Sequence, residues 1–412
     1  MEIAIIGGGA AGFFGAIAGA ETNKNSMVIL FERSGKLLAK LRISGGGRCN
    51  VTQACFDNGL LVQGYPRGHK ELRGPFQQFD AQSTVDWFTA RGVRLKTEPD
   101  GRMFPTTDNS ETIAQCLLQS ADDSGVKIRM NTGVDAIKPI DGKFELTLSN
   151  GEKMICDKVL IASGSGTKLE HFNWLQELGH EIVPPLPSLF TFNIHDKPLA
   201  ELSGISVENA TLKITGSKLQ QTGPLLITHW GVSGPAVLKL SAWGAREFAA
   251  SNYRFELVIN WLTGYTEESL RAFLQAKKEE SIRKNISAFS PLTLPLRLWK
   301  WILQKAEIPE ETKWADCSKK QFNKLVETFL ATRLQVVGKS TFKEEFVTAG
   351  GVSLKDVNLK TMESKKCPGL FFAGEVLDID GITGGYNFQA AWTTGWIAGN
   401  NLTPATFVNV EP

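Results

Sequence analysis

The 412-residue sequence is short of several features that would mark a specialised protein. Its six cysteines lie singly along the chain, without the C-x-x-C spacing of a dithiol redox centre or of half a zinc site. No apolar run approaches the ~18 residues that a membrane span needs. The chain also lacks a large charge of one sign, because 45 Lys and Arg stand against 43 Asp and Glu. These absences argue against disulfide-reductase chemistry and predict a soluble, cytoplasmic protein of a reducing compartment.

The length and the local patterns predict more than one domain. Strand-like and helix-like runs alternate up to a Pro-Pro-Leu-Pro connector at 184–187, after which short β-type runs and then helical patterns follow. We therefore expect a discontinuous α/β domain with two insertions. Its predicted parts are the first portion of the α/β domain at 1–186, a β-rich subdomain at 187–264, a helical subdomain at 265–335, a return through the β-rich part at 336–348 and the second portion of the α/β domain at 349–412.

A glycine-rich turn after the first strand satisfies the dinucleotide-binding pattern G-x-G-x-x-G. Gly7 would make the tight turn, Gly9 would let a diphosphate approach the backbone, and Gly12 would permit close contact between helix and strand. A helix is predicted from Gly12 to about Ala20, and its N-terminus would offer amide donors and partial positive charge to the diphosphate, with Ala10 and Ala11 beside it. The pattern lies between a strand and a helix, and this context favours a bound dinucleotide over an ordinary turn.

Two acids narrow the dinucleotide to FAD. Glu32 ends the second predicted strand, where an acid accepts hydrogen bonds from the adenosine ribose. Near the C-terminus, another strand runs into Gly374 and Glu375, and in FAD-containing Rossmann proteins such an element reaches the ribityl chain and the diphosphate. Asp is more usual than Glu at this position, so Asp378 and Asp380 are alternatives.

Two further loops are expected to border the flavin. The loop at 381–387 leads into a helix whose N-terminus would stabilise the negative charge that develops on flavin reduction. Small residues follow the strand at 158–161, as at the crossover that flanks FAD in such folds. Leu169 stands where a third glycine would be needed, so this crossover is not a second dinucleotide fingerprint. A nicotinamide donor, NADH or NADPH, would therefore bind transiently.

Four segments in a fixed order carry a family resemblance. They are 40–52 (KLRISGGGRCNVT), 228–238 (THWGVSGPAVL), 348–352 (TAGGV) and 374–387 (GEVLDIDGITGGYN). Together they resemble the YhiN/BaiN-like family of bacterial flavoproteins, often labelled aminoacetone oxidase-like or NAD(P)/FAD-dependent oxidoreductases. The resemblance implies FAD and a flavin pocket lined by the loops at 44–50 and 381–387. The stretch at 164–168 departs from the longer loop of many relatives.

The predicted cofactor contacts combine the fingerprint, the resemblance and a basic segment at 33–48 that contains no acid. Within that segment, we interpret Arg42 and Arg48 as contacts to an anion or to the flavin, with a solvated basic loop as the alternative. The predicted cofactor-binding residues are Gly7, Gly9, Ala10, Ala11, Gly12, Glu32, Arg33, Lys40, Arg42, Gly46, Gly47, Arg48, Asn50, Ala162, Ser163, Gly164, Gly374, Glu375, Gly385, Tyr386 and Asn387.

Three residues are candidates for proton transfer. Cys49, next to Arg48, would act as a proton donor if the neighbouring charge lowered its pKa, and burial as a small apolar residue is the alternative. His229 would be a general acid near neutral pH, or it would satisfy loop carbonyls. Tyr386 would donate a proton or pack as an aromatic residue. Asn50 suits a hydrogen bond to the flavin or to a neighbouring loop.

The predicted function is that of an FAD-dependent oxidoreductase. Its preferred reaction is NAD(P)H-dependent reduction of an activated C=C, with uridine in ribosomal RNA as the specific substrate. Residues 265–343 hold 15 Lys and Arg against 9 Asp and Glu, a formal charge of +6, and such a basic insertion favours an RNA partner. A small-molecule substrate, an oxygen-dependent amine oxidase and a non-enzymatic redox-sensing flavoprotein are the other hypotheses.

Overall fold

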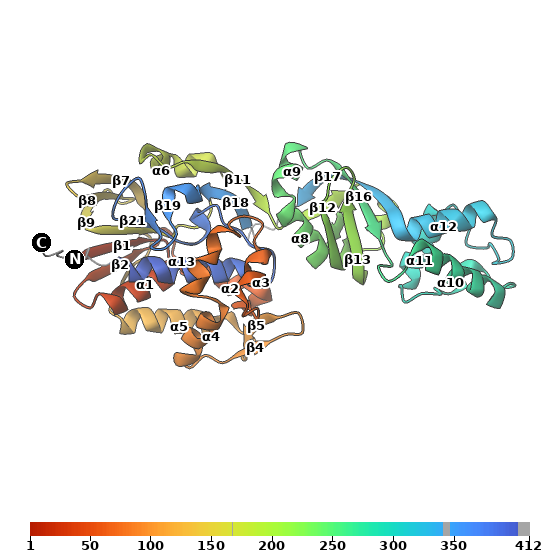
Figure 1. The fold of residues 1–412 in the computed structure, drawn as a ribbon, viewed down its shortest axis with the longest axis horizontal. Helices are drawn as coiled ribbons and strands as arrows, with labels where there is room; N and C mark the ends of the chain where they lie inside the picture. Colours follow the sequence, from red (N-terminus) through yellow and green to blue (C-terminus); the bar gives the residue numbers. More distant parts are fainter. Residues whose placement is uncertain (167, 341–346, 403–412) are drawn as a thin grey trace, which may run out of the picture. The chain divides into compact units, whose positions relative to one another are not determined.

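The computed structural model describes residues 1–166, 168–340 and 347–402. The chain divides into two compact units, each with its own hydrophobic core (Figure 1). The first unit comprises Met1–Pro187 and the chain from Lys343 onward, and the insert unit comprises Ser188–Phe342. Thr167, which lies in the stretch that departs from the family pattern, is outside the described residues.

A seven-stranded sheet forms the centre of the first unit. Five of its strands are parallel, and the strands β1, β2, β10 and β21 are buried apolar runs, as expected where both faces of a sheet are covered. Two short strands continue the sheet in antiparallel fashion at one edge. In spatial order the strands are β19 (Val357–Asn358), β20 (Glu363–Ser364), β21 (Leu370–Phe372), β10 (Lys158–Ile161), β1 (Glu2–Ile6), β2 (Met27–Phe31) and β6 (Lys127–Arg129).

Helices α1 (Ala10–Thr22) and α13 (Tyr386–Asn400) pack tightly together although they come from opposite ends of the chain (Figure 1). Glycines permit this close approach. A Cβ atom on Gly395 would lie 2.5 Å from the carbonyl oxygen of Ala11, and one on Gly399 would lie 2.5 Å from that of Gly15. The last described helix is thereby fixed against the helix that follows the fingerprint, so the two portions of the α/β domain form one core.

Smaller elements of the first unit surround this centre. A sheet of β7, β8 and β9 and another of β3, β5 and β4 are both antiparallel. The elements are α2 (Ala39–Gly47), β3 (Thr52–Gln53), α3 (Asn58–Leu61), α4 (Ala81–Ala90), β4 (Leu95–Thr97), β5 (Arg102–Pro105), α5 (Ser110–Asp123), β7 (Val134–Ile140), β8 (Lys143–Leu148), β9 (Lys153–Cys156), α6 (Asn173–Glu177), β11 (Ile182–Ser188), β18 (Val347–Val352) and the short 3₁₀ turn η7 (Gly374–Val376).

The proline-rich segment at 184–187 differs from the stiff connector expected from its sequence. It lies inside β11, which pairs with β18 in a two-stranded sheet. Proline lacks the N–H donor of a sheet ladder, and it is tolerated here because both strands of a two-stranded sheet are edge strands. Gly350 of β18 has a φ of +102°, and a Cβ atom there would lie 2.5 Å from the carbonyl oxygen of Pro184.

The insert unit is a closed six-stranded barrel followed by helices. The barrel has the order β12-β15-β14-β13-β16-β17, and β17 begins immediately after α12. Its elements are β12 (Thr191–Ile194), α7 (Lys197–Ala200), β13 (Ser206–Ile214), β14 (Gln220–Thr228), β15 (Gly231–Ser233), α8 (Pro235–Trp243), α9 (Ala245–Ala250), β16 (Phe255–Asn260), α10 (Glu267–Glu280), α11 (Leu296–Lys305), α12 (Lys319–Ala331) and β17 (Thr332–Ser340).

The architecture confirms the predicted fold class, an α/β protein with a discontinuous Rossmann-type domain and inserted β-rich and helical parts. Trp299, Trp314 and Phe329 stack in the helical part of the insert unit, with centroid distances of 6.5 Å and 5.6 Å from Trp299. Within the described ranges, no helix combines the length and the apolar character needed to cross a membrane.

Candidate functional site

The glycine fingerprint forms the turn between β1 and α1. Gly7 has a φ of +115°, and a Cβ atom on it would lie 2.3 Å from the carbonyl oxygen of Ala162. A Cβ atom on Gly12 would lie 1.9 Å from the carbonyl oxygen of Gly7, so both positions require glycine for packing alone. Gly9 is different, because a Cβ atom there would meet nothing within 4 Å. The open side of the turn is therefore at Gly9, where a diphosphate is expected.

The N-terminus of α1 offers donors to an anion. Its N-cap is Gly9, which provides no side-chain cap, and the first amide bonded within the helix is that of Phe13, to the carbonyl oxygen of Gly9 at 3.0 Å. The preceding amides of Ala10, Ala11 and Gly12 belong to the helix end whose donors have no intrahelical acceptor. The first turn carries no acid that would repel a phosphate. Chemically, this end fits the diphosphate of FAD.

Glu32 stands at the end of β2 beside the same turn. One carboxylate oxygen accepts the amide of Gly8 at 2.9 Å, and the other accepts the amide and hydroxyl of Ser34 at 2.8 Å and 2.7 Å. These three bonds hold the side chain in place and leave about one of the carboxylate's roughly four acceptor positions. A ribose hydroxyl suits this remaining position.

The end of β10 lies on the other side of the fingerprint. The amide of Ala162 donates to the carbonyl oxygen of Ile6 at 2.8 Å, which aligns the ends of β10 and β1. Ser163 and Gly164 follow, and Gly164 has a φ of +75°. A Cβ atom on Gly164 would lie 4.0 Å from a carboxylate oxygen of Glu375, so this crossover and the C-terminal glycine-acid element are neighbours.

Gly374 and Glu375 bring the C-terminal element to the first turn of α1. A Cβ atom on Gly374, whose φ is +75°, would lie 2.7 Å from Cβ of Ala11, and its amide donates to the Thr394 hydroxyl at 2.9 Å. The Glu375 carboxylate accepts from the ammonium of Lys40 at 2.6 Å. Predicted cofactor contacts from three distant segments are thereby brought together: Ala11, Lys40 and the Gly374-Glu375 pair.

The two alternative acids have other partners. The Asp378 carboxylate accepts the amide of Gly350 at 3.0 Å. Asp380 is 1% exposed and forms a bidentate ion pair with Arg67, which is 9% exposed. Sequence reasoning did not identify Arg67. The only signal was the presence of two acids in the otherwise apolar run at 376–382, since the ion pair joins residues 313 positions apart. Glu375 is therefore the acid that the structure shows next to the crossover after β10.

The triple glycine interrupts α2 with non-helical backbone. Gly45, Gly46 and Gly47 have φ values of +58°, +70° and +82°. A Cβ atom on Gly45 would lie 2.8 Å from the ring of Phe104, whereas one on Gly46 or Gly47 would meet nothing within 4 Å. Gly45 therefore packs against the protein, and the next two glycines present bare backbone to open space, where a ligand ring can approach.

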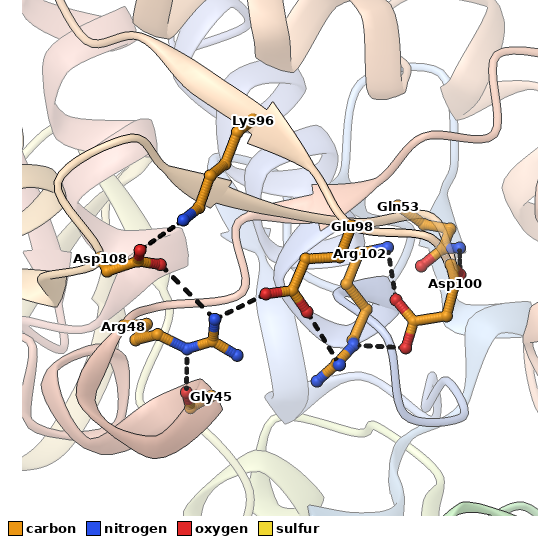
Figure 2. A network of polar contacts seen from close by, with 8 residues as sticks. All are labelled: Gly45, Arg48, Gln53, Lys96, Glu98, Asp100, Arg102 and Asp108. Carbon is orange, nitrogen blue, oxygen red and sulfur yellow. Dashed lines mark hydrogen bonds and ion pairs between the residues drawn. The ribbon is translucent and has the colours of Figure 1, made fainter.

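A network of charged side chains holds this loop (Figure 2). The Arg48 guanidinium lies 4.0 Å from the centre of the Phe104 ring and donates to Glu98 at 2.6 Å and to Asp108 at 3.4 Å. It also donates to the carbonyl oxygen of Gly45 at 3.4 Å. Glu98 in turn accepts from Arg102 at 2.9 Å. The network ties the glycine loop to the sheet of β3, β4 and β5.

Two further arginines of the basic segment are also paired with acids. Arg42 forms two hydrogen bonds with Glu111, at 2.9 Å and 3.1 Å, and Arg33 meets Asp135 at 2.7 Å. The segment contains no acid itself, but the fold supplies acids from other segments. Contacts of Arg33, Arg42 and Arg48 with the cofactor stay predictions, because each guanidinium already has a carboxylate partner.

Asn50 and Asn387 order the N-terminus of α13. In the orientation that satisfies both amide atoms, the Asn50 side chain accepts the amide of Gly385 at 3.0 Å and donates to the carbonyl oxygen of Thr52 at 3.1 Å. Asn387 accepts the amide of Gly381 at 2.9 Å and donates to its carbonyl oxygen at 3.0 Å. Of the two partners considered for Asn50, the structure shows the neighbouring loop.

Of the two interpretations of Cys49, the structure shows burial as a small apolar residue. The side chain is fully buried, and loss of solvent raises the pKa of its thiol to about 12, so the neighbouring Arg48 does not lower it. The reason is that the Arg48 charge is directed to Glu98 and Asp108, while the thiol lies in an apolar core. Cys49 is therefore a neutral thiol at physiological pH.

Tyr386 opens α13 and is half-buried. Its ring fills the space beside Gly64, where a Cβ atom would lie 2.2 Å from the ring, and it meets Tyr65 edge-on at 5.6 Å. Burial, with a smaller contribution from Cys55, raises the pKa of the phenol to about 12. Tyr65, which sequence reasoning missed, donates its hydroxyl to the carbonyl oxygen of Tyr386 at 2.7 Å.

His229 belongs to the insert unit. It lies in the turn between β14 and β15, it is exposed, and its ring meets that of Trp230 edge-on at 4.2 Å. The Thr228 hydroxyl beside it is buried and has no hydrogen-bond partner among the described residues. A role for His229 as a general acid stays a prediction.

The fold and the glycine-rich turn define a Rossmann-type dinucleotide-binding protein. Comparison with known proteins supports this class. Residues 1–401 match the family model described as HI0933-like protein Rossmann domain. In a comparison of structures, the chain aligns with a 3-ketosteroid-Δ4-(5α)-dehydrogenase from Rhodococcus jostii RHA1 with a TM-score of 0.53 and 14% identity, over 97% of this chain and 96% of that one.

Two curated relatives are similar along almost their whole length. A ribosomal RNA dihydrouridine synthase of Escherichia coli (strain K12) is 31% identical, over 98% of both chains. A 3-dehydro-bile acid Δ4,6-reductase of Clostridium scindens is 26% identical, over 97% of this chain and 98% of the relative. The chain belongs to the HI0933-like family of FAD-dependent oxidoreductases, which confirms the resemblance drawn from the four sequence segments.

Proposed function

We propose that this protein uses a nicotinamide donor to reduce an activated C=C, and that its substrate is uridine in ribosomal RNA. The observation that carries the proposal is the similarity over 98% of both chains to a ribosomal RNA dihydrouridine synthase. A second such synthase, from Haemophilus influenzae, is 30% identical over 96% of both chains. Conversion of uridine to dihydrouridine adds one hydride and one proton across a C=C next to a carbonyl, and NAD(P)H becomes NAD(P)⁺.

FAD, when bound, supplies the hydride-transfer chemistry, and the protein supplies binding and orientation. The N-terminus of α1 would hold the diphosphate, with Gly9 leaving room for it, and Glu32 would accept the adenosine ribose hydroxyls. Glu375, fixed by Lys40, would stand near the ribityl chain. The bare backbone at Gly46 and Gly47 would border the ring system.

The proton that completes the reduction needs a donor. Tyr386 is proposed for this step because it is half-buried, stands at the N-terminus of α13 and keeps its phenol protonated with a pKa of about 12. Cys49 is a weaker candidate, because its thiol is fully buried within the core. The N-terminus of α13 would also favour negative charge developing beside it.

A small enone is the second candidate substrate, favoured by the 26% identity with the bile acid reductase. Both reactions reduce a C=C conjugated to a carbonyl, so one site chemistry serves either substrate. The positive charge of residues 265–343 supports RNA over a small carboxylic acid, since a large polyanion gains more from a formal charge of +6.

Two measurements test the proposal. Anaerobic mixing with NADH or NADPH should bleach the yellow flavin band, and subsequent addition of uridine-containing RNA should restore it. Dihydrouridine mapping in ribosomal RNA from a strain that lacks the gene should show the loss of a modified site, which returns when the gene is restored. An unchanged modification profile would remove RNA as the substrate, and reoxidation by an enone alone would favour the small molecule.

A further inference from the structure

The helical part of the insert unit gathers basic residues at one end, which we call the basic tip. It consists of Lys278, Arg283, Lys284, Lys313, Lys319 and Lys320. Two chain segments run antiparallel there, with the amide of Ile286 bonded to the carbonyl oxygen of Thr312 at 2.8 Å and the amide of Trp314 to that of Lys284 at 3.1 Å. Arg283 and Lys284 are therefore beside Lys313.

The ends of two helices complete the basic tip. Lys278 near the C-terminus of α10 donates to the carbonyl oxygen of Cys317 at 2.8 Å, which ties that helix end to the residue before the N-cap of α12. Lys319 and Lys320 open α12 and are exposed. Figure 1 shows α10 and α12 side by side in the helical part, where they also contact each other.

Most cations of the basic tip are exposed and lack a close carboxylate in the described part of the chain. In the described part of the chain, no carboxylate lies within 4.0 Å of Arg283, Lys284, Lys313, Lys319 or Lys320, although each is exposed. Several cations elsewhere in the helical part are matched with acids: Arg271 meets Glu267 at 2.8 Å and Lys300 meets Glu310 at 2.6 Å. Arg297 instead donates to the backbone carbonyl of Glu201. The two segments of the basic tip, 278–284 and 311–320, hold six Lys and Arg against four Asp and Glu, so the tip keeps a net positive charge.

Apolar groups accompany this charge. Ile282 is 52% exposed, and Lys284 lies 5.6 Å from the ring centre of Phe289, which is half-buried. Single-stranded nucleic acid presents phosphates to cations and unstacked bases to apolar or aromatic side chains, so both features suit it. A small carboxylic acid would need one or two cations, and five would be superfluous.

We propose that the basic tip is an RNA-docking surface that holds the phosphate backbone of the substrate. This inference rests on the proposed reduction of uridine in RNA. It adds to that proposal the residues through which a ribosomal RNA would be captured. Because the binding would come from phosphate contacts, it would be independent of base identity and would weaken as salt rises.

The test compares two triple variants of the full-length, flavin-containing protein. The tip variant carries Arg283→Gln, Lys284→Gln and Lys313→Gln. The matched control carries Arg254→Gln, Lys213→Gln and Lys218→Gln, at exposed positions on the barrel of the same unit. Binding of fluorescently labelled fragments of deproteinised ribosomal RNA is measured at several salt concentrations, and thermal melting verifies the fold of each variant.

The tip variant should bind at least about tenfold more weakly, and its log K against log salt plot should be shallower by about 2, since each lost phosphate contact removes roughly 0.7–0.9 from the slope. The control should stay within about twofold of the unchanged protein. Equal losses in both variants, or no loss in the tip variant, would overturn the docking surface. It is also overturned if the tip variant loses binding to phosphatidylserine vesicles while its RNA binding is unchanged.

Flavin bleaching by NADH or NADPH separates this inference from the proposed function. Both variants should bleach at the rate of the unchanged protein, because their substitutions lie in the insert unit, outside the dinucleotide fold. If the unchanged protein does not bleach, the proposed reaction fails whatever the binding result. If it bleaches and reduces RNA but the tip variant binds RNA normally, only the docking surface fails.

Discussion

At the scale of single residues, the fingerprint glycines divide into those needed by the fold and one that leaves room for a ligand. Gly7 and Gly12 have no space for a Cβ atom, whereas Gly9 faces open space with an ordinary φ of −94°. The two kinds of glycine should therefore respond differently to substitution. This difference separates a cofactor role from a packing role.

We expect Gly9→Leu to abolish FAD retention while the apoprotein melts within a few degrees of the unchanged apoprotein, because the side chain occupies the space of the diphosphate. Gly12→Ala should instead destabilise the fold by about 3 kcal/mol, since its Cβ would clash with the carbonyl oxygen of Gly7. The measurements are flavin stoichiometry and thermal melting. Gly264→Leu, at another open position, is the control and should keep its flavin. Full flavin content in the Gly9 variant would contradict the assigned role.

Cys49 should resist alkylation in the native protein. Its pKa of about 12 leaves on the order of one thiolate in 10⁴ at pH 8, and the side chain is fully buried. The half-exposed Cys55 should react with iodoacetamide at pH 8, and peptide mass spectrometry reports both sites. Rapid labelling of native Cys49 would show that the thiol is accessible and would return it to the proton-donor candidates.

Tyr386→Phe should slow reduction of the C=C by about 10²-fold, the usual contribution of a positioned proton donor. Because burial raises the phenol pKa to about 12, the donor stays protonated, and the rate should not fall between pH 6 and pH 10 through this group. Flavin reduction by NAD(P)H should be unaffected and serves as the control. An unchanged rate of substrate reduction in stopped-flow experiments would leave Tyr386 a packing residue.

At the scale of elements, the basic segment at 33–48 is held in place by acids from α5 and from the chain that follows β4 and β5. Arg42 of α2 pairs with Glu111 in the first turn of α5, and the Ser110 hydroxyl donates to the carbonyl oxygen of Arg42 at 2.7 Å. The Arg48 network similarly joins the glycine loop to β5 (Figure 2). The loop geometry that would border the flavin therefore depends on contacts made well away from it.

The Arg42–Glu111 pair should give a pH-dependent contribution to stability. Hydrogen bonds from Arg42 and Gln115 lower the pKa of Glu111 below 4.5, so the contribution is present above about pH 4.5 and is lost as the pH falls through the lower, folded-state pKa. Because the Glu111 side chain is 42% exposed, solvent limits its size to about 0.5 kcal/mol.

Urea unfolding of Glu111→Gln at pH 7 and at pH 3 measures this contribution. The variant should be less stable at pH 7, and the difference should shrink at pH 3. Glu177→Gln, at an exposed carboxylate of α6, is the control and should show no such trend. A constant difference at both pH values would assign the effect to something other than ionisation.

At the scale of the whole molecule, the chain has two separate cores, and the residues that would hold FAD lie in only one of them. A ligand stabilises the unit that binds it, by about 2.7 kcal/mol at a hundredfold excess over Kd. Removal of FAD should therefore increase amide exchange at 7–12, 44–50 and 374–376 and leave the barrel strands unchanged. Hydrogen-exchange mass spectrometry of the flavin-free and flavin-loaded protein measures this. Equal changes in amide exchange in both units would contradict the prediction that FAD stabilises only the first unit.

Much of the fold was predictable from local sequence. The strand–glycine–helix start, the Asn150-Gly151 hairpin between β8 and β9 and the strand before Gly374 all follow from short-range periodicity and turn residues. The prolines at 184–187 predicted a connector where the structure has a strand. A strand that pairs on one side only can contain proline, because not every backbone N–H group has to donate to a neighbouring strand. The closed barrel was visible only as separate β-type runs, since barrel closure is set by pairings far apart in sequence.

The sequence by itself determined the class of cofactor, because the fingerprint, Glu32 and the Gly374-Glu375 element act through backbone shape and side-chain type within short segments. Only the tertiary structure decided which charges are free. It paired Arg33, Arg42 and Arg48 with acids from distant segments and buried Cys49 as a neutral thiol. Among the residues that the structure describes, it left Arg283, Lys284 and Lys313 of the basic tip with no carboxylate within 4.0 Å. The physical reason is that Coulomb interactions and desolvation depend on distances in space, and these are set by the packing of the whole chain.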